Sequence, residues 1–479
     1  MNIQRIKRSF RMSTKAYRDF RPFVHFTPKY GWINDPNGLT YENGTWHLFA
    51  QHNPDEPIWG PMHWLHATST DLLHWTEHGV ALAPDELGMI FSGSAVIDQG
   101  NTSGLGQSDN PMVVIYTSHG EHEQQSIAVS DDRFHFTPYA GNPVIPNTEK
   151  RNFRDPKVFR NPIRNCWTMV LAAGDRAEFY ASQDLIHWTK TGDFGSRENR
   201  LNGVFECTDL FPLQAPDGSE VWVLVVSIAL HSEFGGGRMQ YFLGHFDGDT
   251  FTEDAPHSPY ILDSGYDNYA AVTFFGTEKR IMIGWGSSPS YAPFAPTGDF
   301  CCLMTYAREL SLVETDSGLR LSSKPITPSF ALTEISREPM PTDLRFPQRY
   351  IPKAAGALPG ELFHIHVEAD EAFDLMLSND EGEELHILIN NEQKLVVDRT
   401  RAGLRSFNPV FESGVCSVTS ASRNNFGKIS LDLYFDRMFV EVFTDNGTVL
   451  NSSMVFPKKP YQTATLTGNG TMWIGHPKK

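Results

Sequence analysis

The chain has 479 residues, more than one hydrophobic core usually serves, so two domains are expected. With 40% apolar and 20% charged residues, its composition is that of a soluble globular protein. The formal charge of −17 disfavours nucleic acid and anionic membranes as partners, and a neutral small molecule is the better candidate.

The N-terminal segment, residues 1–24, is basic and has no acidic residue before Asp19. It lacks the apolar stretch of a secretory signal, although its composition is compatible with an organellar transit peptide. No apolar run is long enough to predict a membrane span. The five cysteines form no CxxC pair and are odd in number, which favours reduced thiols. These features together predict a cytoplasmic location.

Residues 25–325 consist of short apolar runs separated by Gly, Pro, Asn and Asp, the pattern of β-strands. A turn followed by an aromatic residue repeats within them: Thr70-Asp71-Leu72-Leu73-His74-Trp75 recurs as Gln183-Asp184-Leu185-Ile186-His187-Trp188. With two weaker copies, the repeat is marked by Trp75, Phe136, Trp188 and Phe251. Repeats of this length that contain several strands predict propeller blades. We expect an all-β chain with a five-bladed β-propeller in which each mark starts an outer strand.

The sequence changes character after the propeller region. Residues 326–350 are rich in Pro, Ser and Thr and predict a linker. Alternating strands return from residue 351, among them residues 362–368 and 373–377, and Asp445-Asn446-Gly447 is a strong hairpin turn. Residues 351–479 are therefore predicted to form a C-terminal β-sandwich.

Three carboxylates stand in short motifs: Asp35 in Asn34-Asp35-Pro36-Asn37-Gly38, Asp155 in Arg154-Asp155-Pro156, and Glu206 before Cys207. Each motif alone is compatible with a turn or a surface charge. However, each carboxylate falls early in its blade, where the innermost strand lines the central channel, and Ser92 falls at a similar place. Carboxylates that meet in one channel raise one another's pKa. Glycoside hydrolysis needs such a pair, one ionised and one protonated.

These motifs closely resemble the three signatures of glycoside hydrolase family 32, which contains invertases, fructan exohydrolases, inulinases and levanases. The resemblance extends over nearly the whole chain. Further matching segments are Leu48-Phe49-Ala50-Gln51-His52-Asn53-Pro54, Trp59-Gly60-Pro61-Met62-His63-Trp64, Phe91-Ser92-Gly93-Ser94-Ala95, Gly265-Tyr266-Asp267-Asn268-Tyr269-Ala270, Ile283-Gly284-Trp285, and Phe435-Asp436-Arg437 with Val440-Glu441-Val442-Phe443.

The resemblance implies a retaining hydrolase of terminal β-D-fructofuranosides that works without metal or cofactor through a covalent fructosyl-enzyme. By analogy, Asp35 is the nucleophile, Glu206 the acid/base, and Asp155 steadies the sugar, with Arg154 keeping Asp155 ionised. The Asp35–Glu206 separation is then expected at about 5–5.5 Å, the retaining distance. The residues expected to contact substrate are Trp32, Asn34, Gln51, Trp59, Phe91, Ser92, Arg154 and Trp285.

The sequence departs from the family pattern at three positions: Thr208 stands where Pro is common, His52 where an aromatic residue is common, and Leu65 where Gly is common. The departures leave the pH optimum and the leaving group open. The expected location favours sucrose, sucrose 6-phosphate or short fructo-oligosaccharides over long polymers. Copies of the chain could associate through the β-sandwich.

Four other functions are compatible with parts of the sequence. A fructosyltransferase would share every catalytic residue and differ in the acceptor. An inverting arabinanase-type glycosidase fits the propeller but not these motifs, and a non-catalytic glycan-binding propeller has no need for all three carboxylates. A metal site among the neighbouring histidines His47, His52, His63, His66, His74 and His78 lacks supporting ligand spacing, so we expect them to pack.

Overall fold

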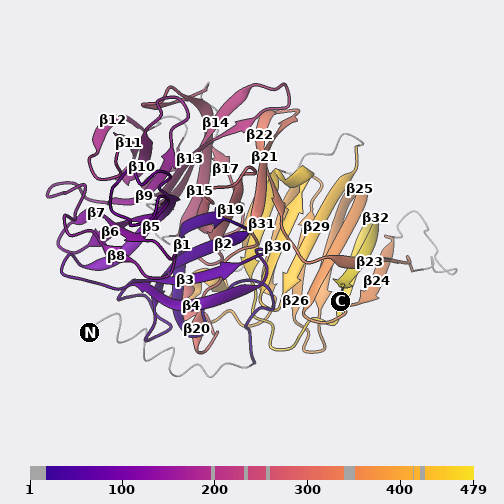
Figure 1. Ribbon diagram of the computed structural model, residues 1–479. Coiled ribbons are helices and arrows are strands. Elements are labelled where there is room, and N and C mark those ends of the chain that lie inside the picture. Colours follow the sequence, from indigo (N-terminus) through magenta and orange to yellow (C-terminus); the bar gives the residue numbers. More distant parts are fainter. Residues whose placement is uncertain are drawn as a thin grey trace, which may run out of the picture.

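The computed structural model describes residues 18–195, 200–230, 236–254, 259–338, 351–413, 415–420 and 427–478. Within these residues nearly every element is a β-strand, arranged as five small sheets and one ten-stranded sheet. Figure 1 shows the small sheets around a common centre on the left and the larger sheet beside them. This confirms the prediction of an all-β chain with a five-bladed β-propeller followed by a β-sandwich.

The blades follow one another along the chain, and within each blade neighbouring strands pair antiparallel. The first two blades consist of β1 (Gly31–Glu42), β2 (Thr45–Asn53), β3 (His63–Ser69) and β4 (Trp75–Leu82), then β5 (Met89–Ile97), β6 (Met112–His119), β7 (Glu123–Ser130) and β8 (Thr137–Pro138). The next two consist of β9 (Phe153–Arg160), β10 (Trp167–Ala173), β11 (Ala177–Ser182) and β12 (Thr189–Phe194), then β13 (Gly203–Gln214), β14 (Glu220–Leu230), β15 (Gly237–Phe246) and β16 (Phe251–Glu253), with β17 (Tyr260–Ile261) on β15. The fifth consists of β18 (Tyr269–Thr273), β19 (Ile281–Trp285), β21 (Arg308–Thr315) and β22 (Gly318–Pro325).

The aromatic marks of the repeat lie where the sequence predicted them. Trp75 and Phe251 begin β4 and β16, while Phe136 and Trp188 directly precede β8 and β12, each the outer strand of its blade. The preceding turn is held by an aspartate: the carboxylate of Asp71 accepts the backbone N–H groups of residues 73 and 74 and the ring of His74. Asp132 and Asp184 do the same in the next two blades. The repeat is thus a recurring side-chain-capped turn.

The propeller ring is closed by a short strand, β20 (Phe300–Cys301), which lies in the sequence between the second and third strands of the fifth blade. It pairs in parallel with the start of β1 in the first blade, so that Gly31 lies opposite Phe300 and Trp32 opposite Cys301. Gly31 has φ +90°, and a Cβ there would lie 2.2 Å from the carbonyl oxygen of Asn53, so the close approach of β2 requires glycine. Between β19 and β20 lies the 3₁₀-helix η1 (Ala292–Phe294).

Two long strands belong to both layers of the C-terminal sandwich. The strand β25 (Leu362–Ser378) pairs with β29 through its first half and with β26 through its second, and β32 (Thr463–Pro477) accompanies it along both halves. The sequence predicted two strands here, residues 362–368 and 373–377; they are one strand with an irregularity between Ala369 and Phe373. The other strands are β23 (Phe330–Ile335), β29 (Ile429–Asp436), β30 (Phe439–Thr444) and β31 (Val449–Met454) in one layer, and β24 (Lys353–Ala357), β26 (Glu384–Ile389), β27 (Lys394–Arg401) and β28 (Val415–Ser420) in the other.

The junction between β22 and the sandwich is partly strand. Within the expected linker, residues 326–350, β23 pairs with β32 and joins the sandwich sheet; residues 339–350 lie outside the described part. The described part of the domain also contains two short helices, α2 (Pro409–Glu412) and the 3₁₀-helix η3 (Asp445–Gly447), which forms the predicted turn between β30 and β31.

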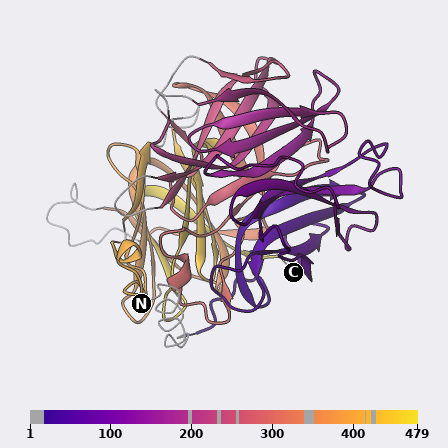
Figure 2. The ribbon, with the colours of Figure 1, turned by 90° about the vertical axis from the view of Figure 1, so that its left-hand side faces the viewer.

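The propeller and the sandwich lie side by side, as Figure 2 shows from a second direction. Their contact contains buried charged and polar groups, which we call the interface cluster: Asp263, Arg308, Glu441 and Ser452. The Arg308 guanidinium is 3.1 Å from a carboxylate oxygen of both Asp263 and Glu441, and it donates to Ser452 Oγ at 2.7 Å. Nearby, Asp436 of the sandwich accepts the backbone N–H groups of residues 23–25 and contacts the ring of His25 at 2.9 Å.

The described part of the chain contains no helix with the length and apolar character of a membrane span.

Candidate active site

Every blade has an irregularity at the same place on its innermost strand. In β1, β5, β9, β13 and β18, two residues lie opposite one residue of the neighbouring strand, which is the arrangement of a β-bulge. The inserted pairs are Asn34–Asp35, Phe91–Ser92, Asp155–Pro156, Cys207–Thr208 and Ala270–Ala271. We call these the channel bulges. A bulge turns side chains away from the regular alternation of a strand, and here five of them surround one channel.

The local sequence explains why these strands bulge. Asp35 and Asp155 are each followed by proline, which has no N–H to contribute to a ladder, so a missing pairing there leaves no donor unsatisfied. Asp155, Cys207 and Ala270 have left-handed φ values of +65°, +45° and +54°. Such values are strained for residues other than glycine and tend to occur at functional sites.

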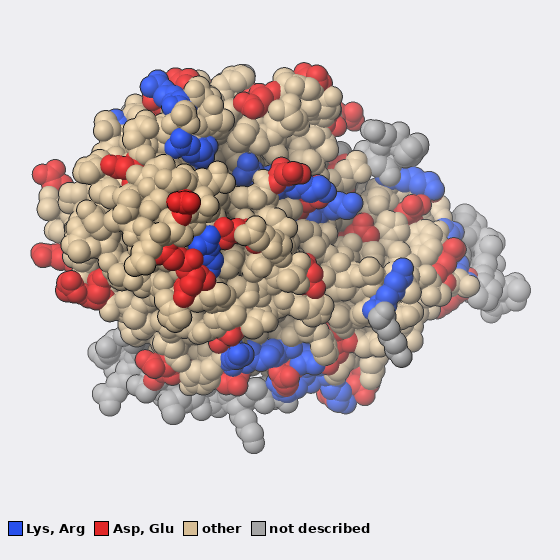
Figure 3. Space-filling model, in the orientation of Figure 1, with Lys and Arg blue, Asp and Glu red and all other residues tan. Residues whose placement is uncertain are grey.

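A cavity of about 640 Å³ opens at the bulged end of the channel and is lined from all five blades. It contains ten of the eleven residues predicted from the sequence: Trp32, Asn34, Asp35, Gln51, Trp59, Phe91, Arg154, Asp155, Glu206 and Trp285. The eleventh, Ser92, is buried next to Asp35. On the face shown in Figure 3, acidic and basic side chains are interspersed and most of the surface carries neither, which suits an uncharged ligand.

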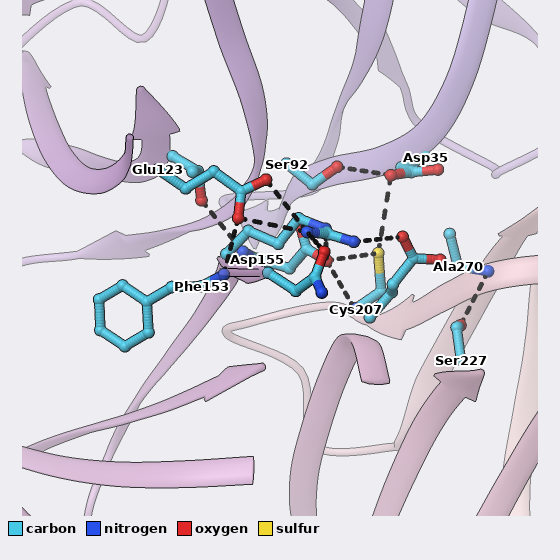
Figure 4. A network of polar contacts seen from close by, with 12 residues as sticks. Asp35, Ser92, Glu123, Phe153, Asp155, Cys207, Ser227 and Ala270 are labelled. Atoms are coloured by element: carbon cyan, nitrogen blue, oxygen red, sulfur yellow. Dashed lines mark hydrogen bonds and ion pairs between the residues drawn. The ribbon is translucent and has the colours of Figure 1, made fainter. Parts of the chain in front are cut away.

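Asp35 is held through one of its two carboxylate oxygens. Ser92 Oγ donates to Oδ2 at 2.6 Å and Gln51 Nε2 at 3.1 Å, while the thiol of Cys207 is 3.7 Å away. Figure 4 shows Ser92 and Cys207 approaching Asp35 from its two sides. None of the described residues makes a hydrogen bond to Oδ1. A carboxylate fixed in this way keeps one oxygen available to attack a substrate.

Asp155 is the most deeply buried of the three carboxylates. Its Oδ2 accepts the backbone N–H of Cys207 at 2.9 Å, and its own N–H donates to Thr117 Oγ1 at 3.0 Å. Burial raises the pKa of Asp155 to about 7, aided by the negative charges of Asp35 and Glu206 and opposed by Arg154. Arg154 therefore offsets the loss of solvent only in part, and the expectation that it keeps Asp155 ionised stays a prediction.

Arg154 instead joins two glutamates. Its Nη2 donates to Glu206 Oε1 at 2.8 Å and its Nη1 to Glu123 Oε1 at 3.0 Å, whereas its nearest approach to Asp155 is 3.9 Å. The other oxygen of Glu206, Oε2, accepts the hydroxyl of Tyr269. Burial raises the pKa of that hydroxyl well above its usual value, as do the charges around it, so Tyr269 remains a donor. Glu206 is thus positioned by two donors, one to each carboxylate oxygen.

Indole rings form part of the cavity wall. Trp32 donates from Nε1 to Asn34 Oδ1 at 2.7 Å, which orders both side chains, and its ring lies 6.1 Å from that of Trp285. Trp285 Nε1 is buried without a hydrogen-bond partner among the described residues. Such a donor beside a cavity can bind an acceptor group of a ligand. At the rim, Trp59 is 39% exposed and packs edge-on against Phe91.

Among the lining residues not predicted from the sequence, three carry polar side chains: Tyr269, Glu123 and His119. Tyr269 lies directly before the channel bulge of the fifth blade, so the phase of the blades could have indicated it. Glu123 and His119 lie on β7 and β6 and belong to no motif. His119 stacks on Phe91 with ring centroids 4.0 Å apart, and its Nδ1 is 3.5 Å from Glu123 Oε1.

The expected packing role of the histidines is seen in the first blade. His47 and His66 stack 5.3 Å apart with Nδ1 and Nε2 at 3.1 Å, and His66 also stacks on Phe49. Burial lowers the pKa of His47 to about 4 and that of His66 to about 2, so both rings are neutral. Within the described residues no group of three or more His, Cys, Asp or Glu side chains has the arrangement of a metal site.

Comparison with known proteins identifies relatives over the whole length of both domains. Residues 25–325 match the family "Glycosyl hydrolases family 32 N-terminal domain" and residues 352–474 match "Glycosyl hydrolases family 32 C terminal". The levanase of Bacillus subtilis is 39% identical over 92% of this chain and 67% of its own.

Solved structures agree with this assignment. The exo-inulinase of Aspergillus awamori superposes with a TM-score of 0.84 at 29% identity, covering 97% of this chain and 99% of its own. The β-fructofuranosidase of Schwanniomyces occidentalis, complexed with fructosyl-erythritol, gives a TM-score of 0.86 at 27% identity, covering 98% of this chain and 100% of its own.

Proposed function

The chain belongs to glycosyl hydrolase family 32 and is a glycoside hydrolase acting on β-fructofuranosides, and we propose that it removes terminal non-reducing β-D-fructofuranosyl residues with retention of configuration. The observation that carries this proposal is the meeting of Asp35, Asp155 and Glu206 in one cavity. They come from three different blades, and the thiol of Cys207 is 3.7 Å from both Asp35 Oδ2 and Asp155 Oδ2.

In the first step we assign the attack to Asp35. Its Oδ1 adds to the anomeric carbon of the fructosyl group while the bond to the leaving oxygen breaks, and Glu206 transfers its proton to that oxygen. The products are a fructosyl ester of Asp35 and the free leaving group. The contacts of Ser92 and Gln51 to Oδ2 hold the nucleophile in place, which lowers the entropy that the step must lose.

In the second step the same groups act in reverse. Glu206, now a carboxylate, takes a proton from a water molecule whose oxygen attacks the anomeric carbon, and the ester bond to Asp35 breaks. Fructose leaves, and both residues return to their starting states. A separation of about 5–5.5 Å between the two carboxyl groups is expected for this double displacement.

Asp155 and the two indole rings are assigned to binding the fructosyl ring. A carboxyl group next to hydroxyls can accept their hydrogen bonds more strongly as positive charge develops on the ring, which stabilises the transition state. Trp32 and Trp285 supply apolar faces and one N–H donor without a protein partner. These features specify the fructose side of the scissile bond, while the leaving group meets the rim formed by Trp59, Phe91 and His119.

One incubation series tests this function. The purified protein is incubated with sucrose, sucrose 6-phosphate, an inulin-type and a levan-type oligosaccharide, and the sugars released are followed over time. We expect fructose as the first product from at least sucrose or a short oligosaccharide. In the presence of methanol, retention predicts methyl β-D-fructofuranoside; the α-anomer as the main product would contradict the double displacement.

The same series at low and high substrate separates hydrolysis from transfer. A transferase makes longer oligosaccharides at high substrate in preference to free fructose, whereas a hydrolase releases fructose at both. The preference for short substrates, the cytoplasmic location and self-association through the sandwich stay predictions; chain-length series, cell fractionation and light scattering test them.

A further inference from the structure

Among the described residues that line the cavity, Glu123 is the one carboxylate without a role in the double displacement. It begins β7 in the second blade, and its side chain is 11% exposed. Its Oε2 accepts the backbone N–H of Phe153 at 2.6 Å, and both of its oxygens accept from Arg154, at 3.0 and 3.2 Å. Figure 4 shows the contact of the Glu123 carboxylate with the backbone of Phe153. It is therefore fixed to the strand that carries Arg154 and Asp155.

Arg154 divides its charge among three carboxylates. Glu123 takes one side of the guanidinium and Glu206 the other, while Asp155 lies 3.9 Å from Nε. Burial would lower the pKa of Arg154, but these carboxylates raise it, so it is a permanent cation. A cation that gave all its charge to Glu206 would favour the ionised form of that residue. The acid step needs the protonated form.

We propose that Glu123 is a positioning residue: it holds the Arg154 guanidinium and neutralises part of its charge, so that Glu206 can carry the proton that the leaving group needs. This inference rests on the proposed function. It assigns to Glu123 a contribution to the step that protonates the leaving oxygen, and little to the attack by Asp35.

The surroundings of Glu123 keep it charged for this role. His119 on β6 is 3.5 Å from Oε1, Arg154 and the Phe153 N–H approach from β9, and together they lower the pKa of Glu123 against the effect of burial. Glu206 in turn faces Arg154 and Tyr269, and Asp155 faces Cys207 and Asp35. Glu123 therefore keeps its negative charge at neutral pH.

The test compares two substrates that differ in their need for acid. Glucose leaves sucrose as a poor leaving group that requires a proton, whereas 4-nitrophenolate leaves its β-D-fructofuranoside without one. For Glu123→Gln we expect kcat/KM on sucrose at pH 7 to fall about 10- to 100-fold and on the aryl substrate less than about 3-fold. The alkaline limb of the sucrose profile should move to lower pH by about one unit, because the lost negative charge favours ionisation of the facing carboxylates.

Two variants complete the design. Glu123→Asp keeps the charge, so its alkaline limb should stay at the wild-type pH while kcat on sucrose falls more than on the aryl substrate. Glu178→Gln is the matched control, since Glu178 is also a buried glutamate bound to basic side chains, Lys150 and Lys190, outside the cavity. Its loss of Tm can match that of Glu123→Gln, but both substrates should keep their wild-type ratio.

Equal losses on both substrates, or an unmoved alkaline limb in Glu123→Gln, would overturn the proposal. If that variant does not fold, Glu123→Asp decides, because an unselective loss there contradicts the role equally. A wild-type protein inactive on both substrates would instead refute the proposed function itself.

Discussion

The active-site cavity and the domain interface both bury carboxylates, but they compensate the charge differently. At the interface, Arg308 forms ion pairs with Asp263 and Glu441, and His25 forms one with Asp436. Burial alone would raise the pKa of Asp263 and Asp436, but these partners lower it. In the cavity, one arginine faces Asp155, Glu206 and Glu123, and the pKa of Asp155 is raised to about 7.

The two arrangements of charge have different consequences: the interface affects the stability of the protein, and the cavity affects its chemistry. Paired charges in a dry interface cost little as long as every partner is present, and they fix how the two domains meet. Gly265 shows how close that meeting is, since a Cβ there would lie 2.0 Å from the backbone oxygen of Ser452. Where carboxylates share too few cations, burial and their mutual repulsion raise a pKa, as they do for Asp155. Asp267 is an exception among the paired interface carboxylates, because burial raises its pKa even though Arg399 lies beside it.

The comparison is tested most severely by Asp35→Asn. We expect kcat to fall by at least about 10⁴-fold, because no other group is placed to attack, while the free energy of unfolding stays at or above the wild-type value, since one of three like charges is removed. Fructose release and urea denaturation measure the two effects. Near-wild-type turnover would refute the assignment of the nucleophile.

Arg308→Ala should have the opposite outcome. It leaves Asp263 and Glu441 buried without their cation, which should cost about 3–5 kcal/mol of unfolding free energy, while the activity per folded molecule remains. Lys279→Ala is the control, because the exposed pair of Lys279 with Glu309 should cost less than about 1 kcal/mol. A similar loss in both variants would remove the distinction between paired interface charges and ordinary surface ones.

Asp155→Asn should show how the buried cavity carboxylate makes the stability of the protein depend on pH. The folded-state pKa of about 7 lies above the ordinary value of 3.8, so the buried carboxylate destabilises the fold as pH rises through this window, with no penalty below it and the full penalty above about 7. The variant should lose at least about 100-fold in activity but gain on the order of 1–3 kcal/mol at pH 8 and little at pH 4. Thermal unfolding at both pH values measures this; a gain independent of pH would contradict it.

His25→Gln is the smallest expected effect and has the reverse pH dependence. Burial lowers the pKa of His25, but Asp436 and Glu441 outweigh it and raise the pKa to about 9, above the ordinary 6.5. Its contribution is therefore complete below about pH 6.5 and is lost as pH rises through 9. The variant should be less stable by about 1–2 kcal/mol at pH 6 and nearly equal to wild type at pH 9.5. The same difference at both pH values would show that the imidazolium charge contributes nothing.

Much of the fold was predictable because it repeats. The Asp-capped turn before Trp75 recurs before Trp188, so the blades could be counted, and their phase brought Asp35, Asp155 and Glu206 to the inner strands. The continuous strand β25 was not predictable, because the residues between its halves have the polar character of a turn although they pair on through both sheets.

Within the site, the residues were easier to predict than their contacts. Arg154 precedes Asp155 in sequence, yet β-strand geometry sends neighbouring side chains apart, and its guanidinium reaches Glu206 and Glu123 instead. Glu123 carries no sequence signal, since it stands in none of the motifs. The left-handed φ values at Cys207 and Ala270 could not be predicted from the sequence either, because such values in residues other than glycine depend on tertiary contacts.

The closure of the ring by β20 has a consequence for synthesis on the ribosome. The strand that carries Asp35 is among the first to emerge, but its parallel partner, Phe300–Cys301, follows roughly 270 residues later, which at 5–20 residues per second is about 15–50 seconds. Until then the nascent first blade presents an unpaired edge, the kind of surface on which chains associate wrongly. We therefore expect slow elongation or absent chaperones to reduce the yield of this enzyme more than that of a propeller closed by consecutive strands.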